Sequence, residues 1–140
     1  SIVATLDHAA LYVTDLDVIR DFYCTHLGAR SNEGYHNPTT GLRTYFLTFG
    51  GTARLEIMTR PEVSQQAAQA PGDRPLRLGW DHLAFTVGSP QEVDALTDRL
   101  RREGMEILSG PRTTGDGYYE TLFLDPEGNR VEIVADRATG

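Results

Sequence analysis

The sequence predicts an α+β fold built from two copies of one β-α-β-β-β module. Three observations lead to this prediction. The stretch "DHAALYVTD" from residue 7 is matched by "DHLAFTVGS" from residue 81. A helical pattern that ends at glycine follows each stretch, and each half closes with a strand, a turn and a second strand. Self-similarity of this kind indicates an internal duplication.

Each copy opens with a strand in which apolar residues alternate with other residues. Leu11 lies opposite in parity to His8, and Phe85 lies opposite in parity to His82. Because successive side chains of a strand point to opposite faces of a sheet, each apolar set predicts a face buried under a helix. Each histidine is therefore expected on the other face.

The next element of each copy is a helix with sequence signals at both ends. Asp15 and Ser89 are typical N-cap residues, and Pro90 suits the first helical position. Gly28 and Gly104 end the two patterns, because glycine readily adopts the left-handed conformation that follows a helix. The spacing predicts one helix between each cap and the glycine after it.

The hairpins that end the two copies are the clearest part of the match. "TYFLTFGGTARLEIM" corresponds to "ETLFLDPEGNRVEIV", with Glu56 matched to Glu132. Pro126 presets φ and Gly128 tolerates a positive φ, so "DPEGN" predicts a tight turn. The third element of each module, a strand, is weaker and is expected at 29–35 and 105–110. We place the modules within a single domain, with these bounds: first module 1–60, linker 61–79, second module 80–140.

Composition excludes several classes of function. The formal charge is −7, and all 13 basic residues are arginines that form no basic block, which argues against a nucleic-acid partner. No apolar run approaches the roughly 20 residues that cross a bilayer, so no membrane partner is expected. A single cysteine, Cys24, and the lack of a signal-peptide pattern predict a cytoplasmic protein.

Strand parity places four side chains with metal-ligand chemistry on the polar faces of the strands: His8, Glu56, His82 and Glu132. Taken singly, each residue is more typical of a solvated strand position. Their occurrence at matched positions of both copies favours a shared role as ligands of a divalent metal ion such as Ni, Zn, Mn, Fe or Co. Four protein ligands around a six-coordinate ion leave two positions open for a chelating substrate.

The sequence resembles the vicinal oxygen chelate superfamily, the glyoxalase, bleomycin-resistance and extradiol-dioxygenase group. The motifs that carry the resemblance are "LDHAALYVTDLDVIRDFYCTHLGA", "ARLEIM", "WDHLAFTV" and "FLDPEGNRVEIV", which together span most of the chain. The resemblance implies paired βαβββ modules that form a cup-shaped mixed sheet around a metal ion.

Within that superfamily, the chain is similar to the glyoxalase I branch in its ligand pattern of His8, Glu56, His82 and Glu132. This resemblance implies a metal-dependent lyase or isomerase that acts on an α-hydroxycarbonyl or thiohemiacetal through a metal-bound enediolate. Glu132 is then the catalytic base, and Glu56 can serve the opposite face of the substrate. It also implies two partners: a small-molecule substrate, and a second copy of the chain in a homodimer.

One departure from the glyoxalase I pattern concerns the thiol. Tyr12 stands where bacterial glyoxalase I enzymes carry an arginine for glutathione, which leaves Arg43, Arg54 and Arg112 as substitute anion contacts. Two alternative functions remain open. The first is a metal-poor protein that binds a drug or small molecule, as bleomycin-resistance proteins do. The second is an Fe-dependent extradiol dioxygenase, which needs two histidines and one glutamate.

Overall fold

The computed structural model describes residues 2–66 and 72–137, and the chain divides into two compact units, Ser1–Ala68 and Gln69–Gly140. Residues 67–71 of the predicted linker lie outside the described residues. Within the described part of the chain, no helix has the length and apolar character needed to cross a membrane.

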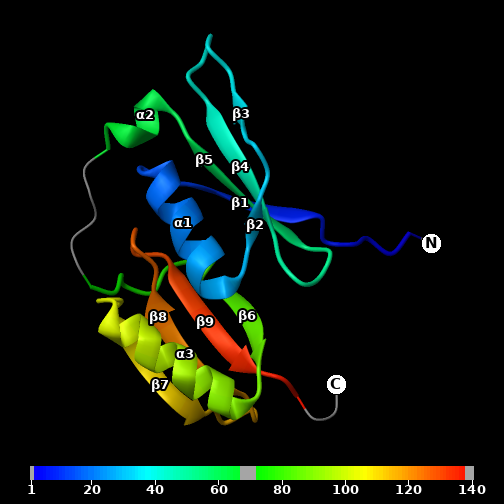
Figure 1. Cartoon of the computed structure of the whole chain (residues 1–140), viewed down its shortest axis with the longest axis vertical. Coiled ribbons are helices and arrows are strands. Elements are labelled where there is room, and N and C mark those ends of the chain that lie inside the picture. The colour runs from blue at the N-terminus through cyan, green and yellow to red at the C-terminus, as the bar shows by residue number, and fades with distance from the viewer. Residues whose placement is uncertain (1, 67–71, 138–140) are drawn as a thin grey trace. The chain divides into compact units, whose positions relative to one another are not determined.

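The first unit is a mixed sheet with one long helix against it (Figure 1). Its strands run in the order β1-β5-β4-β2, and β3 pairs with β4; β1 and β5 are parallel, while the other pairs are antiparallel. The elements are β1 (His8–Tyr12), α1 (Leu16–Leu27), β2 (Arg30–Ser31), β3 (Tyr35–His36), β4 (Arg43–Thr48), β5 (Arg54–Thr59) and α2 (Pro61–Ser64).

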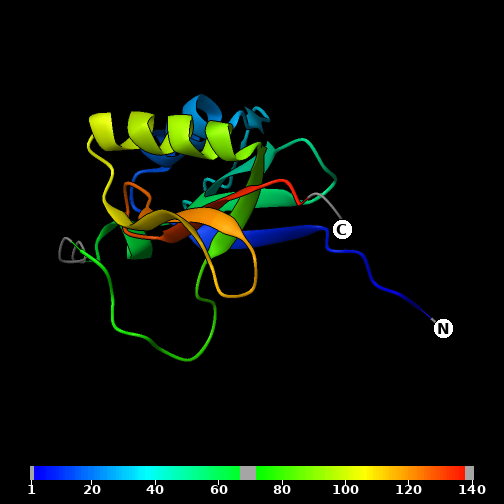
Figure 2. The ribbon, with the colours of Figure 1, turned by 90° about the horizontal axis from the view of Figure 1, so that it is seen from below.

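The second unit repeats this plan. Its four strands run in the order β6-β9-β8-β7, with β6 parallel to β9 and the other neighbours antiparallel. Figure 2 shows α3 as a separate layer on one face of this sheet. The elements are β6 (Leu83–Gly88), α3 (Pro90–Arg102), β7 (Ile107–Thr113), β8 (Tyr119–Leu124) and β9 (Arg130–Ala135).

The predicted α+β fold of two βαβββ modules is confirmed, with one local difference in the first module. Its weak third element, predicted as one strand, is split into β2 and β3, of two residues each. The side chain of Asn32 causes the break, because its Oδ1 accepts hydrogen bonds from the backbone N–H groups of Gly34 and Phe46, at 3.1 and 3.0 Å. A side chain therefore takes the place of a strand partner there.

The helix boundaries follow the predicted signals. Asp15 and Ser89 are the N-caps, and their side chains accept hydrogen bonds from the N–H groups of Val18 and Glu92. Gly28 follows α1 with φ 68°, and Gly104 follows α3 with φ 87°. Each helix therefore begins and ends where local chemistry satisfies its free backbone groups.

The apolar strand faces pack under the helices, which leaves the other faces for chemistry. On β5, Leu55 and Ile57 are 3% and 0% exposed, and the equivalent residues of β9, Val131 and Ile133, are fully buried. The glutamates between them, Glu56 and Glu132, point to the opposite face and are half-buried. The residues buried from the helices include Ile19, Phe22, Tyr23, Val93, Thr97 and Leu100.

Candidate functional site

In the first unit, the fold brings His8 and Glu56 together on the polar face. The parallel register pairs Ala10 with Glu56, so His8 lies two residues away along β1 on the same face. The Nε2 atom of His8 lies 3.6 Å from Oε1 of Glu56. Phe46 on β4 is paired with Glu56. Its ring packs edge-to-face with the imidazole of His8, and the two ring centroids lie 5.2 Å apart.

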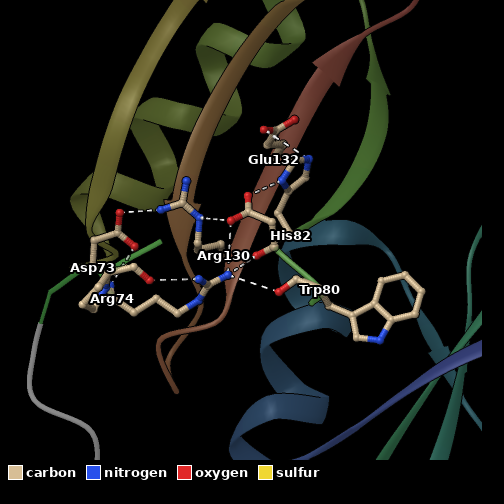
Figure 3. Close-up of polar contacts among 8 residues, drawn as sticks. Asp73, Arg74, Trp80, His82, Arg130 and Glu132 are labelled. Carbon is tan, nitrogen blue, oxygen red and sulfur yellow. Dashed lines mark hydrogen bonds and ion pairs between the residues drawn. The ribbon is translucent and has the colours of Figure 1, made fainter. Parts of the chain in front are cut away.

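The second unit builds the same pair from its own strands. His82 directly precedes β6, and its Nε2 atom lies 3.3 Å from Oε2 of Glu132 on β9 (Figure 3). Ala84 is paired with Glu132 as Ala10 is with Glu56. An alanine at this position leaves the glutamate side chain room to reach the histidine.

An aspartate orients each imidazole. Asp7 and Asp81 directly precede the two histidines, and an Oδ2 atom of each accepts a hydrogen bond of 2.7 Å from the histidine Nδ1. The hydrogen bond to the histidine holds the pKa of each aspartate below its ordinary value, and arginine contacts add to this effect. An ionised carboxylate only accepts, so Nδ1 is the donor and Nε2 is the ring nitrogen that faces the glutamate.

Glu132 differs from an ordinary surface glutamate in its acidity. Burial raises the pKa of its carboxyl group most, and the negative charge of nearby Glu120 raises it further. The positive charge of a protonated His82 works in the other direction. Glu132 therefore takes up a proton more readily than a solvated glutamate, which is the property expected of a general base that works near neutral pH.

The donor set of each pair fits a divalent metal ion. An imidazole Nε2 atom lies 3.6 Å from a carboxylate oxygen in the first unit and 3.3 Å in the second, and both atom types ligate divalent ions when they are deprotonated. Within residues 2–66 and 72–137, no three or more His, Cys, Asp or Glu side chains form one metal-binding group. Each unit therefore offers two ligands, one nitrogen and one oxygen.

Two supporting features were not predicted from the sequence, although both leave a visible signal in it. The aspartates that orient the histidines form a repeated Asp-His dipeptide. An arginine, Arg54 or Arg130, stands two residues before each glutamate. Both arginines contact these aspartates. Glu120 on β8 adds a negative charge that raises the pKa of Glu132.

The arginines expected to serve as anion contacts all have partners within their own units. Arg54 donates to Asp7 at 2.8 Å and lies over the ring of Phe46. Arg43 and Arg112 contact Asp17 and Ser109, at 3.8 and 3.1 Å. Tyr12 lies on the same face of β1 as His8 and is 49% exposed.

The contact between Asp73 and Arg130 predicts that the free energy of unfolding falls in acid. A hydrogen bond from Arg130 holds the pKa of Asp73 below its ordinary value. A lowered pKa contributes stability above the unfolded-state value of about 3.9, and this contribution is lost as the pH falls through the folded-state pKa. We expect Asp73→Asn to lower the free energy of unfolding at neutral pH and to flatten its decline below pH 4, as measured by urea denaturation across pH.

The control for this measurement is Asp136→Asn, a change at an exposed aspartate near the end of β9. It should leave the acid dependence of unfolding unchanged. Equal acid dependence in the wild-type and Asp73→Asn proteins would show that the Arg130 contact does not stabilise the folded state.

Comparison with known proteins identifies relatives that span nearly the whole chain. "Uncharacterized protein YqjT" of Bacillus subtilis is 29% identical over 137 residues, which cover 93% of this chain and 98% of the relative. An "Ethylmalonyl-CoA/methylmalonyl-CoA epimerase" of Cereibacter sphaeroides is 27% identical, covering 89% and 90%. A "Probable lactoylglutathione lyase" of Synechocystis is 23% identical, covering 91% and 92%.

Solved structures share the fold. A glyoxalase family protein from Enterococcus faecalis is similar with a TM-score of 0.71 and 28% identity, over 93% of this chain and 96% of that one. Glyoxalase I of Leishmania major has a TM-score of 0.72 at 21% identity, over 95% and 87%.

The family comparison agrees with the duplicated motifs and the two mixed sheets. The model of the Glyoxalase/Bleomycin resistance protein/Dioxygenase superfamily matches residues 5–133. This span includes both strand-and-hairpin repeats and all four candidate ligands. The chain therefore belongs to the Glyoxalase/Bleomycin resistance protein/Dioxygenase superfamily.

Proposed function

We propose that the protein is a divalent-metal-dependent lyase or isomerase of glyoxalase I type. In this proposal, His8, Glu56, His82 and Glu132 are the metal ligands, and the substrate is an α-hydroxycarbonyl or a thiohemiacetal. The ion is one of the borderline divalent metals: Ni, Zn, Mn, Fe or Co.

One observation carries the proposal: both units repeat the same oriented pair. In each unit an aspartate binds Nδ1 of a histidine, and Nε2 of that histidine faces a glutamate oxygen, at 3.6 Å in one unit and 3.3 Å in the other. A solvated strand histidine has no need of such an orienting carboxylate. A carboxylate that accepts a hydrogen bond from the other ring nitrogen is the usual support of a metal-bound imidazole.

The chain's own residues account for the proton transfer that the reaction needs. A bound divalent ion supplies Lewis acidity toward a substrate oxygen. Glu132 removes the proton from the carbon next to the carbonyl and returns it to the neighbouring carbon, since its raised pKa suits both steps. Glu56 lies in the matched position of the first unit and can hold a proton on the opposite face of the substrate.

The relatives support an enzyme of this type over a drug-binding protein. Two of them carry the names of a lyase and an epimerase, and both match about nine-tenths of the chain. An epimerase also moves a proton at one carbon, so the proposed role of Glu132 fits either name.

We propose a homodimer as the working assembly. The exposed Tyr12 stands where bacterial glyoxalase I enzymes carry an arginine for glutathione. We therefore propose that the thiol part of the substrate can be a thiol other than glutathione.

Elemental analysis of the purified protein, after incubation with each of the five ions, tests the proposal. We expect about one ion per chain, because the four-ligand set binds one metal. The Glu56→Gln and Glu132→Gln variants should each bind markedly less, because an amide is a poorer ligand than a carboxylate. Glu33→Gln changes an exposed glutamate in the same way and should bind as the wild type does.

A wild-type protein that stays metal-free with every ion would contradict the proposed function. Small-molecule binding that persists without metal would then favour the drug-binding alternative. Metal binding together with oxygen consumption on a catechol would favour the dioxygenase.

A further inference from the structure

We infer that Asp81, held by Arg74 and Arg130, is a positioning residue that keeps His82 in the tautomer whose Nε2 lone pair faces Glu132. The effect of Asp81 on metal affinity rests on the proposed function, whereas its effect on the tautomer of His82 does not. The corresponding aspartate of the first unit, Asp7, is held differently and provides a matched comparison.

The two oxygens of Asp81 have separate partners. Oδ2 accepts the hydrogen bond from Nδ1 of His82 at 2.7 Å. Oδ1 receives Nη2 of Arg74 at 3.2 Å and lies 3.4 Å from Nε of Arg130. Because the arginines bind one oxygen and the histidine binds the other, the carboxylate cannot rotate without breaking several contacts.

The two arginines are themselves anchored (Figure 3). The side chains of Arg74 and Arg130 are 13% and 11% exposed. Arg130 also donates to Asp73, and Arg74 also donates to the backbone carbonyls of Trp80 and Asp81, at 3.3 and 2.8 Å. This network ties the segment before β6 to β9, the strand that carries Glu132, so the histidine and the glutamate are set by one rigid frame.

The first unit lacks this division of partners. A single atom of Asp7, Oδ2, receives both Nδ1 of His8 and Nη2 of Arg54, at 2.7 and 2.8 Å. The side chain of Asp7 is 70% exposed, against 40% for Asp81. The carboxylate of Asp7 is therefore less constrained, and its second oxygen is not needed for either contact.

This difference makes opposite predictions for replacement by asparagine. An asparagine has one acceptor oxygen and one amide NH2 group. In Asp81→Asn, the arginines keep the oxygen and the NH2 group faces Nδ1 of His82, which forces the proton onto Nε2. In Asp7→Asn, one oxygen serves both Arg54 and His8, so His8 keeps its proton on Nδ1.

The test is the tautomer of each histidine in metal-free protein labelled with ¹⁵N-histidine. Long-range ¹H–¹⁵N spectra are recorded about two pH units above the ordinary imidazole pKa of about 6.5, and are assigned with His8→Gln and His82→Gln. We expect the Nδ1–H form for both histidines in the wild type, the Nε2–H form for His82 in Asp81→Asn, and no change for His8 in Asp7→Asn. An unchanged His82 tautomer in Asp81→Asn would overturn the inference.

A titration with Co²⁺ supplies the second readout, since loss of an orienting carboxylate typically weakens metal binding about 10–100-fold. Asp81→Asn should show this loss, Asp7→Asn a smaller one, and Asp81→Glu, which retains the carboxylate, a partial recovery. A switched tautomer with unchanged Co²⁺ affinity would overturn the positioning role while leaving the proposed metal site intact. If the wild type binds none of the five ions and Asp81→Asn still switches the tautomer of His82, the proposed function is contradicted and the positioning of His82 is supported.

Discussion

Replacement of Glu132 by glutamine should reduce turnover by about 10²–10⁴-fold, the usual contribution of a general acid–base group. The amide neither accepts nor returns the substrate proton, and it binds a metal ion more weakly than the carboxylate of Glu132. The measurement is kcat with a panel of thiohemiacetals made from α-ketoaldehydes and several thiols, at saturating metal. Deuterium incorporation from D2O at the substrate carbon reports proton removal separately from product formation.

Glu120→Gln is the matched control for this experiment. It removes a neighbouring charge that raises the pKa of Glu132, so that pKa should fall toward the ordinary value. We expect kcat at its plateau to be retained while the acid limb of the pH–rate profile moves to lower pH. Near-wild-type turnover and deuterium exchange in metal-loaded Glu132→Gln would contradict the role of Glu132 as the base.

Replacement of Phe123 by alanine should lower the free energy of unfolding by about 3–5 kcal/mol, the range for removing a buried aromatic side chain. Phe123 is fully buried on β8 and is paired with Val131 on β9, beneath the layer formed by α3. Its loss leaves a cavity that the surrounding strands can fill only in part. Urea denaturation followed by circular dichroism measures the change.

Leu78→Ala serves as the comparison, because Leu78 is fully exposed and its replacement should change the free energy of unfolding by less than about 0.5 kcal/mol. Leu47→Ala tests the repeat, since Leu47 occupies the matched, fully buried position on β4 and should cost about 2–5 kcal/mol. A loss below about 1 kcal/mol in Phe123→Ala would show that the core of the second unit is packed differently.

The sequence by itself determined the duplication, the α+β modules and the faces of the strands. These features depend on local rules: period-two alternation around Glu56 and Glu132, and capping residues such as Asp15 and Ser89. Local rules were weaker for the strand predicted as the third element of the first module. There the side chain of Asn32 bonds to Phe46, 14 residues along the chain, and divides the strand in two.

Only the tertiary structure decided which polar groups support the candidate ligands. The pairing of β1 with β5 and of β6 with β9 sets each histidine beside its glutamate, which parity alone leaves open. The contacts of Arg130 with Asp73, 57 residues away in sequence, and with Asp81 could not be predicted, because a hydrogen bond depends on distances and angles that the order of residues does not specify. The sequence therefore identified the candidate ligands, and the tertiary structure determined which oxygen of each aspartate holds the histidine and which holds an arginine.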